Sequence, residues 1–460
     1  MQTVTYQRCS RGVLIPLVLL LLATPAIEAG SDEEIFRDFP FNFTNPGARA
    51  LGVGGAFISL ADDSTAAQAN PAGLVVLRRP EFFAEFNAQS HDTSEVQVSA
   101  TINTLFFQGD LAASATSTPR TGLNPTFLSY VLPLKKVSLG FSRYETLNVQ
   151  TRTSNSFSII GIEAIVAIDP MSGDATVIGT QPVDFELTSE ADLDARVVQY
   201  NFAAAFELHR KFSIGLTGVL GTADLDGGAD NLFRDSVGGG NFPVLTLDYA
   251  TRINDTDTDF VYNVGMLWRP AGWMNIGAVY RKGLRFELQE RVLDEGVRAV
   301  EARDLYGQSF DNILHIPDSY GLGLSFRPAD PWTILIDVVR LEYSDLMDGF
   351  LTGLNRITFP ETRLDFVVDD GTEVHLGVEK IFLTGTTPVA IRFGAWSDPD
   401  HRIRAEQATN EFVAVFPAGD RVTHYTAGFG MTLKQSIQLD FATDVSSVDT
   451  TAVFSTIFRF

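Results

Sequence analysis

Cysteine is almost absent from this chain of 460 residues, because Cys9 is the only one. Disulfides therefore cannot hold the fold together, and a zinc site or a catalytic thiol built on cysteine is excluded. Positive charge is also scarce, with 34 Lys and Arg against 57 Asp and Glu and a formal net charge of −23. So acidic a chain is poorly suited to binding phosphates, and we expect no nucleic-acid partner.

Long apolar runs are missing after the first 30 residues, which argues against membrane-spanning helices. The N-terminus is different, because Arg8 and Arg11 precede an apolar run over residues 13–23, and the small residue Ala29 follows. This order is typical of a secretory signal peptide. We therefore predict a signal peptide over residues 1–29, with cleavage after Ala29.

The rest of the chain alternates with a period of two residues. In "DFVYNVGMLW", residues 259–268, large apolar side chains fall on one face, while Asn263 and Gly265 fall on the other. Such segments come in pairs around short turns, and long polar stretches such as "DLDGGADNLFRDSVGGGN" separate the pairs. We expect six hairpins, near 126–150, 195–222, 259–288, 319–343, 373–396 and 423–445. With a first strand near 81–89 and a last strand over 451–460, the count is fourteen.

Strands with one apolar and one polar face, joined by alternating short and long connections, are typical of a membrane barrel. The last strand, "TAVFSTIFRF", places Phe454, Phe458 and Phe460 on one face. A terminal aromatic strand of this kind resembles the strand that closes outer-membrane barrels and is read by the barrel assembly machinery. We therefore predict an all-β protein, with residues 81–460 forming a transmembrane antiparallel β-barrel in contact with outer-membrane lipids and lipopolysaccharide.

A segment of small residues precedes the first predicted strand. "GARALGVGGAFISLADDSTAAQANPAGL", residues 47–74, is rich in Gly and Ala and has Phe57 as its one large aromatic residue. Eight strands leave an interior that side chains can fill, whereas sixteen to eighteen leave an aqueous channel. A barrel of fourteen strands would therefore leak unless it were plugged. We predict that residues 30–80 form a hatch inside the lumen.

The pattern "NPGARALGVGGAFISLADDSTAAQANPAGL" resembles the N-terminal hatch of the FadL/OmpP1/TodX family of outer-membrane transporters for hydrophobic molecules. The resemblance implies a protein of the Gram-negative outer membrane that takes up long-chain fatty acids or other apolar compounds and releases them sideways into the bilayer. It implies no catalysis and no cofactor. It also assigns the hatch and gating positions, which are Gly47, Gly52, Gly54, Gly55, Asn70, Pro71 and Ala72.

A carboxylate ligand would need an Arg or Lys to pair with its head group. By strand parity we expect Arg143, Arg281 and Arg392 to point into the lumen, where they are candidate contacts for such a group. The alternative is that these three cations pair with lumen acids. The candidate acids are Glu145, Glu379 and Asp440.

Two other functions stay open at this stage. A barrel of the PorV type acts as a scaffold in protein secretion, and a general porin passes hydrophilic solutes. A continuous apolar tunnel would indicate transport of hydrophobic molecules, a stable partner protein would indicate secretion, and an open wet pore would indicate a porin. Catalysis is not expected, because His375 and Glu379 share a face but no nucleophile pattern accompanies them. The acidic stretches contain no twelve-residue calcium loop, so no metal site is expected either.

Overall fold

The computed structural model describes residues 43–91, 94–103, 107–119, 123–168, 175–235, 245–293, 309–348, 366–385, 387–401, 404–405, 420–447 and 449–460. The predicted signal peptide and the first part of the predicted hatch, through residue 42, lie outside the described residues.

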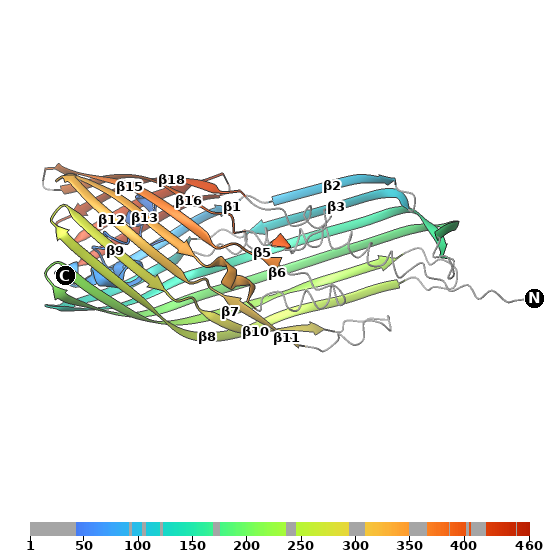
Figure 1. Ribbon diagram of the computed structural model, residues 1–460, viewed down its shortest axis with the longest axis horizontal. Coiled ribbons are helices and arrows are strands. Elements are labelled where there is room, and N and C mark those ends of the chain that lie inside the picture. The colour runs from blue at the N-terminus through green and yellow to red at the C-terminus, as the bar shows by residue number, and fades with distance from the viewer. Residues whose placement is uncertain are drawn as a thin grey trace, which may run out of the picture.

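Fourteen antiparallel strands pair in a closed ring (Figure 1). In their order around it they are β1 (Glu81–His91), β4 (Leu123–Leu134), β5 (Val137–Ile168), β6 (Ala175–His209), β7 (Phe212–Asp235), β8 (Leu245–Ala271), β9 (Met274–Arg281), β12 (Ser319–Ala329), β13 (Trp332–Leu341), β15 (Gly371–Thr384), β16 (Thr387–Asp398), β18 (Val422–Leu433), β19 (Ile437–Val445) and β20 (Asp449–Arg459). The last strand pairs with the first and closes the barrel. The predicted fourteen-strand barrel and its six hairpins are therefore confirmed.

The two faces of each strand separate as the alternation predicts. In β13, every second residue is exposed and the residues between are buried. Five large apolar residues of "DFVYNVGMLW" face outward, with Phe260 67% exposed, whereas Asn263 and Leu267 on the opposite face are buried. Trp268, Trp273 and Trp332 lie exposed beside the short turns. The outer surface is thus apolar and ends in an aromatic band, as a lipid-facing wall requires.

The long polar stretches were predicted as connections, and this was wrong for their described parts. Strands β5 and β6 run for 32 and 35 residues, far beyond the barrel wall. Likewise β7 continues through the stretch that begins at residue 224, as far as Asp235. Side chains pair across these extensions, because Thr256 donates to Asp224 (3.1 Å) and Arg252 donates to Asp230 (2.6 Å). Ladder bonds and polar cross-strand pairs thus support strands without any apolar alternation.

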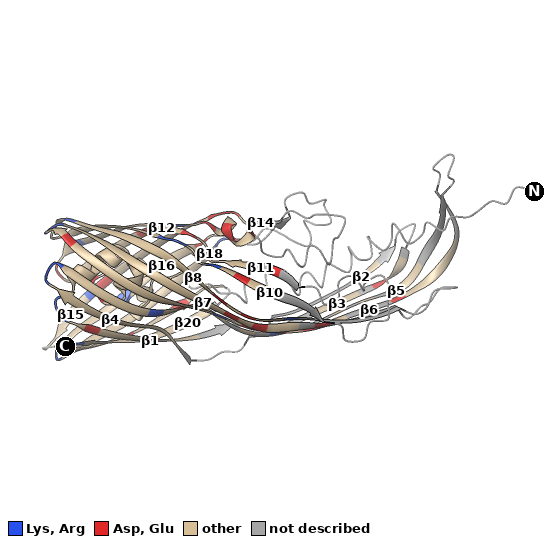
Figure 2. Cartoon of the chain, turned by 90° about the horizontal axis from the view of Figure 1, so that it is seen from below, with Lys and Arg blue, Asp and Glu red and all other residues tan. Residues whose placement is uncertain are grey.

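Four further strands extend the same sheet at the end of the barrel away from the short turns. They are β2 (Ser94–Asn103), β3 (Phe107–Pro119), β10 (Arg285–Leu293) and β11 (Ser309–His315). The pair β2–β3 joins the sheet along β5, and β10 joins it along β8. The two-residue strands β14 (Phe366–Val367) and β17 (Arg404–Ala405) pair separately. Figure 2 shows Asp and Glu along the extended strands and Lys and Arg at the short turns.

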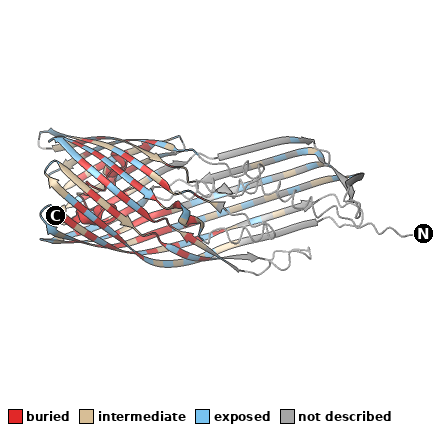
Figure 3. Cartoon of the chain, in the orientation of Figure 1, coloured by how far each residue is buried: buried red, intermediate tan, exposed pale blue. Residues whose placement is uncertain are grey.

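The described part of the predicted hatch, residues 43–80, lies within the ring of strands (Figures 1 and 3). It contains α3 (Ala48–Gly52), α4 (Ala66–Ala69) and the 3₁₀ turn η1 (Pro71–Val76), while η3 (Tyr343–Met347) follows β13. Most of residues 45–75 are buried. No helix among the described residues is long and apolar enough to cross a membrane.

Deleting Phe460 is expected to lower the amount of assembled protein while leaving the folded barrel nearly as stable. The Phe460 side chain is 70% exposed, and its backbone N–H makes one hydrogen bond, to Pro80 O (3.0 Å). The ladder between β20 and β1 ends one residue earlier, so the deletion keeps it intact. The measurement compares outer-membrane yield with the unfolding temperature, and Phe460→Tyr is the aromatic control. An unchanged yield would contradict a role for the terminal residue in assembly.

Candidate functional site

The hatch is seated on glycines of the barrel wall. A Cβ added at Gly265 would overlap Asn70 Oδ1, and one added at Gly394 would overlap the backbone N of Gly54. At Gly277 an added Cβ would lie 2.5 Å from Ile58 O. The inward face of the wall therefore has to be glycine at these positions, because the hatch backbone occupies the space of a side chain.

The four predicted hatch glycines serve two different purposes. Gly47, Gly54 and Gly55 have φ values of +106°, +68° and +77°, which side chains rarely adopt. Gly52 is instead needed for contact, because its added Cβ would lie 3.0 Å from Gly428 Cα of β18. Gly54 N also donates to Thr426 Oγ1 of β18 (3.0 Å).

The element formed by Asn70, Pro71 and Ala72 is a fixed bend that touches the wall. Asn70 is extended, with φ −159° and ψ 103°, and Pro71 begins η1, as expected for the residue before proline. Asn70 Oδ1 accepts from Ala72 N (3.1 Å), and Asn70 Nδ2 donates to Ile58 O (2.9 Å) and to Met266 O of β8 (3.0 Å). The carbonyl of Ala72 accepts from Ser213 of β7 (2.9 Å). One side chain thus holds the bend and joins it to the barrel.

A buried ion network joins the hatch to the opposite wall. Arg392 of β16 lies 2.7 Å from both Glu379 of β15 and Asp440 of β19. Arg49 of α3 also pairs with Glu379 (3.1 Å) and reaches Asp62 (2.6 Å). Arg49 was not among the predicted site residues, although it is the one charged residue between Asp38 and Asp62. An isolated charge in so apolar a stretch could have indicated a buried ion pair, because burial of a charge requires a partner.

The three arginines proposed as head-group contacts have different surroundings. Arg281 points inward as predicted and donates to Asn45 Oδ1 (2.9 Å) and to Ala69 O (2.8 Å) of the hatch. Arg392 also points inward, into the network above. Arg143 does not, and that prediction was wrong. It lies on the outward face with Leu139 and Phe141, which are 44% and 42% exposed.

The ladder between β4 and β5 is interrupted next to Arg143. β4 pairs with β5 as far as Phe127 opposite Tyr144. Residues 123–125 of β4 continue to pair with β1 on their other side, but no pairing with β5 continues among these described residues. Pro125 has no N–H to donate to a ladder, and its carbonyl accepts from Arg143 Nη1 (2.9 Å) instead. Thr126 is bypassed by both ladders.

The first described residues of the hatch lie behind this interruption. Glu85 of β1 is buried and accepts hydrogen bonds from Gly47 N and from Thr126 Oγ1. Tyr144 OH donates to Thr44 O (3.2 Å). Glu145 accepts from Arg143 (2.9 Å), and the same carboxylate also accepts from Arg196 and from Asn148 (2.8 Å each). The Glu85 carboxylate therefore bonds both to the hatch, through Gly47, and to the interrupted strand, through Thr126.

Above the hatch, on the side away from the short turns, two buried apolar clusters occupy the interior. On β7, Ser213 and Thr217 bond to the hatch, whereas Val219 and Leu225, further along the strand, belong to a buried apolar cluster. A second cluster is formed by the hatch, β9, β13, η3 and Val368, and Phe43 packs against both clusters. The members of this second cluster are Ile58, Val279, Val339, Leu341, Tyr343, Leu346 and Val368. The members of the first cluster are Leu147, Ala195, Val197, Val219, Ala223, Leu225, Val261, Leu284, Phe286, Leu288, Leu314 and Ile316. We call these two groups the upper apolar clusters.

A stack of three rings supports the hatch on another side. His375 of β15 stacks on Trp396 of β16 (5.5 Å), which stacks on His424 of β18 (3.9 Å between centroids). His375 Nδ1 lies 2.7 Å from Gly54 O. His375 therefore contacts the hatch backbone, whereas Glu379 pairs with Arg392 and Arg49. Both residues thus join the barrel wall to the hatch.

One group of carboxylates has the spacing of a metal site. Among the described residues, Asp318, Glu342 and Asp345 bring one oxygen each within 4.8 Å of one another. Lys282 Nζ already lies 2.9 Å from Asp318 Oδ1. Burial disfavours the charged form of Asp318, but hydrogen bonds from Gly283 N, Lys282 and Tyr280 outweigh it and lower the pKa of this carboxyl. The ammonium group thus fills the place of a cation.

A closed barrel of fourteen strands whose interior is occupied by its own N-terminal segment is a plugged membrane barrel. The family model described as outer membrane protein transport protein (OMPP1/FadL/TodX) matches residues 186–456, more than half of the chain. The chain therefore belongs to the FadL/OmpP1/TodX family, which is a family of outer-membrane transport proteins rather than of enzymes.

Solved structures agree with this fold. A FadL homologue of Pseudomonas aeruginosa is 13% identical, with a TM-score of 0.58, and the match covers 91% of this chain and 99% of the homologue. The toluene transporter TodX of Pseudomonas putida is 16% identical, with the same coverage and a TM-score of 0.53. The toluene transporter TbuX of Ralstonia pickettii is 13% identical, again with that coverage, and has a TM-score of 0.51. No curated protein sequence matches the chain.

Proposed function

We propose that this protein carries hydrophobic small molecules, such as long-chain fatty acids, related lipids or hydrocarbons, across the outer membrane of a Gram-negative bacterium. In this proposal residues 1–29 direct export, residues 30–80 act as the hatch, and residues 81–460 form the barrel. The glycines and the Asn70–Ala72 element of the hatch control passage.

The observation that carries the proposal is the pair of upper apolar clusters above the hatch. Phe43, the first described residue of the segment, packs against both upper apolar clusters. A path for hydrophilic solutes needs a wet, polar wall at this level, as in porins. An apolar wall with few polar groups is instead the usual environment of a hydrophobic ligand. This favours hydrophobic transport over the general porin.

We place the sideways exit at the interruption between β4 and β5. Backbone polar groups can face away from a ladder only where protein or water satisfies them, and here Arg143 satisfies the Pro125 carbonyl. Thr44 and Gly47 of the hatch bond to residues beside the interruption, so movement of the hatch would change its lining. Arg143 and Arg196 at this exit are the candidates for meeting a carboxylate head group, while Arg281 and Arg392 hold hatch and wall together.

The test is paired uptake in a host that lacks its own transporter. Intact protein should speed uptake of a long-chain fatty acid or an aromatic hydrocarbon several-fold over empty vector, with little change for a sugar. Thr126→Trp should lower apolar uptake towards the vector level, because the indole fills the proposed exit. Leu132→Trp is the matched control, since Leu132 lies on the same strand, 37% exposed, where the ladder is continuous.

The possible failures are distinguishable. If intact protein speeds no apolar tracer, transport is wrong and the PorV-like scaffold is the better hypothesis. If intact protein transports but Thr126→Trp does so equally well, the sideways exit is misplaced while transport stands.

A further inference from the structure

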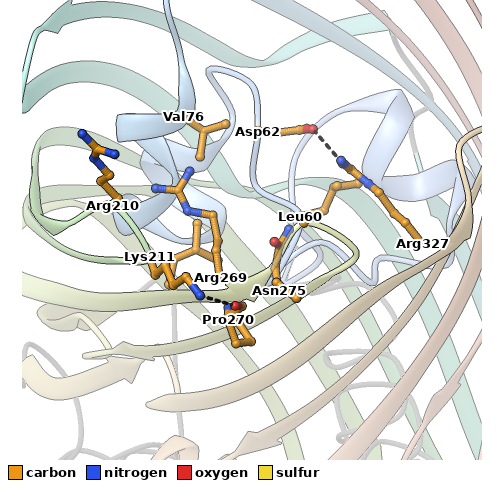
Figure 4. Close-up of a pocket in the computed structure, with 12 residues that line it drawn as sticks. Leu60, Asp62, Val76, Arg210, Lys211, Arg269, Pro270, Asn275 and Arg327 are labelled. Carbon is orange, nitrogen blue, oxygen red and sulfur yellow. Dashed lines mark hydrogen bonds and ion pairs between the residues drawn. The ribbon is translucent and has the colours of Figure 1, made fainter.

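A cavity of about 440 Å³ lies at the short-turn end of the barrel, beneath the hatch (Figure 4). Its walls come from the hatch, from the turn between β6 and β7, from the turn between β8 and β9, and from β12. Leu60, Val76 and Leu267 supply apolar surface. The cavity is on the opposite side of the hatch from the upper apolar clusters, and β4 and β5 contribute none of its lining residues.

The charge in this cavity is opposite to that of the chain. Arg210, Lys211, Arg269 and Arg327 line it together with a single carboxylate, Asp62, although the whole chain has a net charge of −23. Figure 4 shows the cationic side chains approaching from two turns, with Arg327 and Asp62 across the cavity. Such a concentration of positive charge attracts an anion into a concave site.

These cations are poorly neutralised by the protein itself. Arg327 lies 3.9 Å from Asp62, which is held more closely by Arg49 at 2.6 Å. The Nε of Arg269 is buried and has no hydrogen-bond partner, and Arg210 has no ion pair among the described residues. Buried polar groups normally find a partner, and an unpaired buried donor indicates one that is missing.

The chemistry of the lining identifies the class of partner. Guanidinium groups match the geometry of carboxylate and phosphate, whose oxygens accept two parallel N–H donors. The volume lies within the range of small-molecule sites, and the apolar lining suits a hydrocarbon chain. We propose that this cavity binds the carboxylate or phosphate group of a small anionic amphiphile at the short-turn mouth of the barrel. The proposal does not depend on transport or on the sideways exit.

The probes are decanoate and decyl phosphate, with decanol as the uncharged match, titrated calorimetrically against the full protein in lipid nanodiscs. Both anions should bind at least tenfold more tightly than decanol, since a charge-assisted hydrogen bond is lost without the anion. Whichever anion binds more tightly identifies the preferred head group. The titration is then repeated with phosphatidylglycerol in the nanodisc. If the natural occupant of the cavity is a bilayer lipid, phosphatidylglycerol should compete with the added anion and weaken its apparent binding.

Three variants complete the test. The double variant Arg210→Gln with Arg269→Gln should weaken anion binding about tenfold or more. The matched control is Lys135→Gln with Lys434→Gln, which removes two exposed charges from other short turns and should leave binding unchanged. Asp62→Asn should tighten binding several-fold, because it removes the one competing carboxylate, and damage to the fold would not raise affinity.

Two results would overturn the proposal. One is decanol binding as tightly as the two anions. The other is equal anion affinity in intact protein and in the Arg210/Arg269 double variant, with the double variant shown to be folded by its heat-dependent gel mobility.

Discussion

Deleting residues 43–74 is expected to turn the barrel into a conducting pore. Fourteen strands enclose more space than their own side chains fill, because eight strands already fill theirs. In this protein the deleted segment occupies that space, with Phe57, Ile58 and Leu74 fully buried against the wall. The deletion also removes Phe43, which packs against both upper apolar clusters. We expect single-channel conductance in planar bilayers well above that of the intact protein.

The strands retain their ladder without the segment, so the deletion variant should still migrate faster on gels before heating than after. Conductance equal to that of the intact barrel would show that strands and loops, not the hatch, close the lumen. Gly394→Val is the independent variant, since its side chain would overlap Gly54 N and unseat the hatch without shortening the chain. This variant should also have a higher conductance than the intact protein.

The second large effect is expected from Arg392→Ala. The substitution leaves the buried carboxylates of Glu379 and Asp440 without their shared cation. Removing one partner of a buried ion pair costs about 3–5 kcal/mol, because the remaining charge stays desolvated. Arg49 still contacts Glu379, and Gln438 still donates to Asp440. We therefore expect a loss towards the lower end of that range.

The measurement is the free energy of unfolding in urea, followed by tryptophan fluorescence. The matched control is Arg340→Ala, which breaks the 3.0 Å pair with Asp370 on an arginine side chain that is 47% exposed. Exposed pairs contribute about 0–1 kcal/mol, so the control should change little. Adding Asp440→Asn to Arg392→Ala should recover part of the loss. Equal losses for Arg392→Ala and Arg340→Ala would mean that the network does not stabilise the protein.

The barrel could be predicted because its signal is local. The alternation within each strand indicates which side faces lipid, as it does residue by residue in β13. The short turns indicate where the two strands of each hairpin meet. The bend at Asn70 was equally local, because proline restricts the residue before it and the Asn side chain reaches the backbone two residues on.

Other features depended on neighbours that are distant in the chain. The partners of Arg49 and Arg281 are examples, because Arg49 pairs with Glu379 and Arg281 donates to Asn45. The extensions of β7 and β8 could not be predicted from alternation, because they have none. They are held instead by a hydrogen-bond ladder and by polar pairs between the two strands.

The sequence by itself determined the class of this protein, namely a fourteen-strand barrel preceded by a hatch segment with a family pattern, because period-two alternation and glycine content are properties of single segments. Only the tertiary structure decided which cations meet which acids, where the β4–β5 ladder stops, and that four cations at the short-turn end share one cavity with Asp62. These features join residues up to several hundred positions apart. Their positions are set by strand register and ring closure, which no single segment encodes.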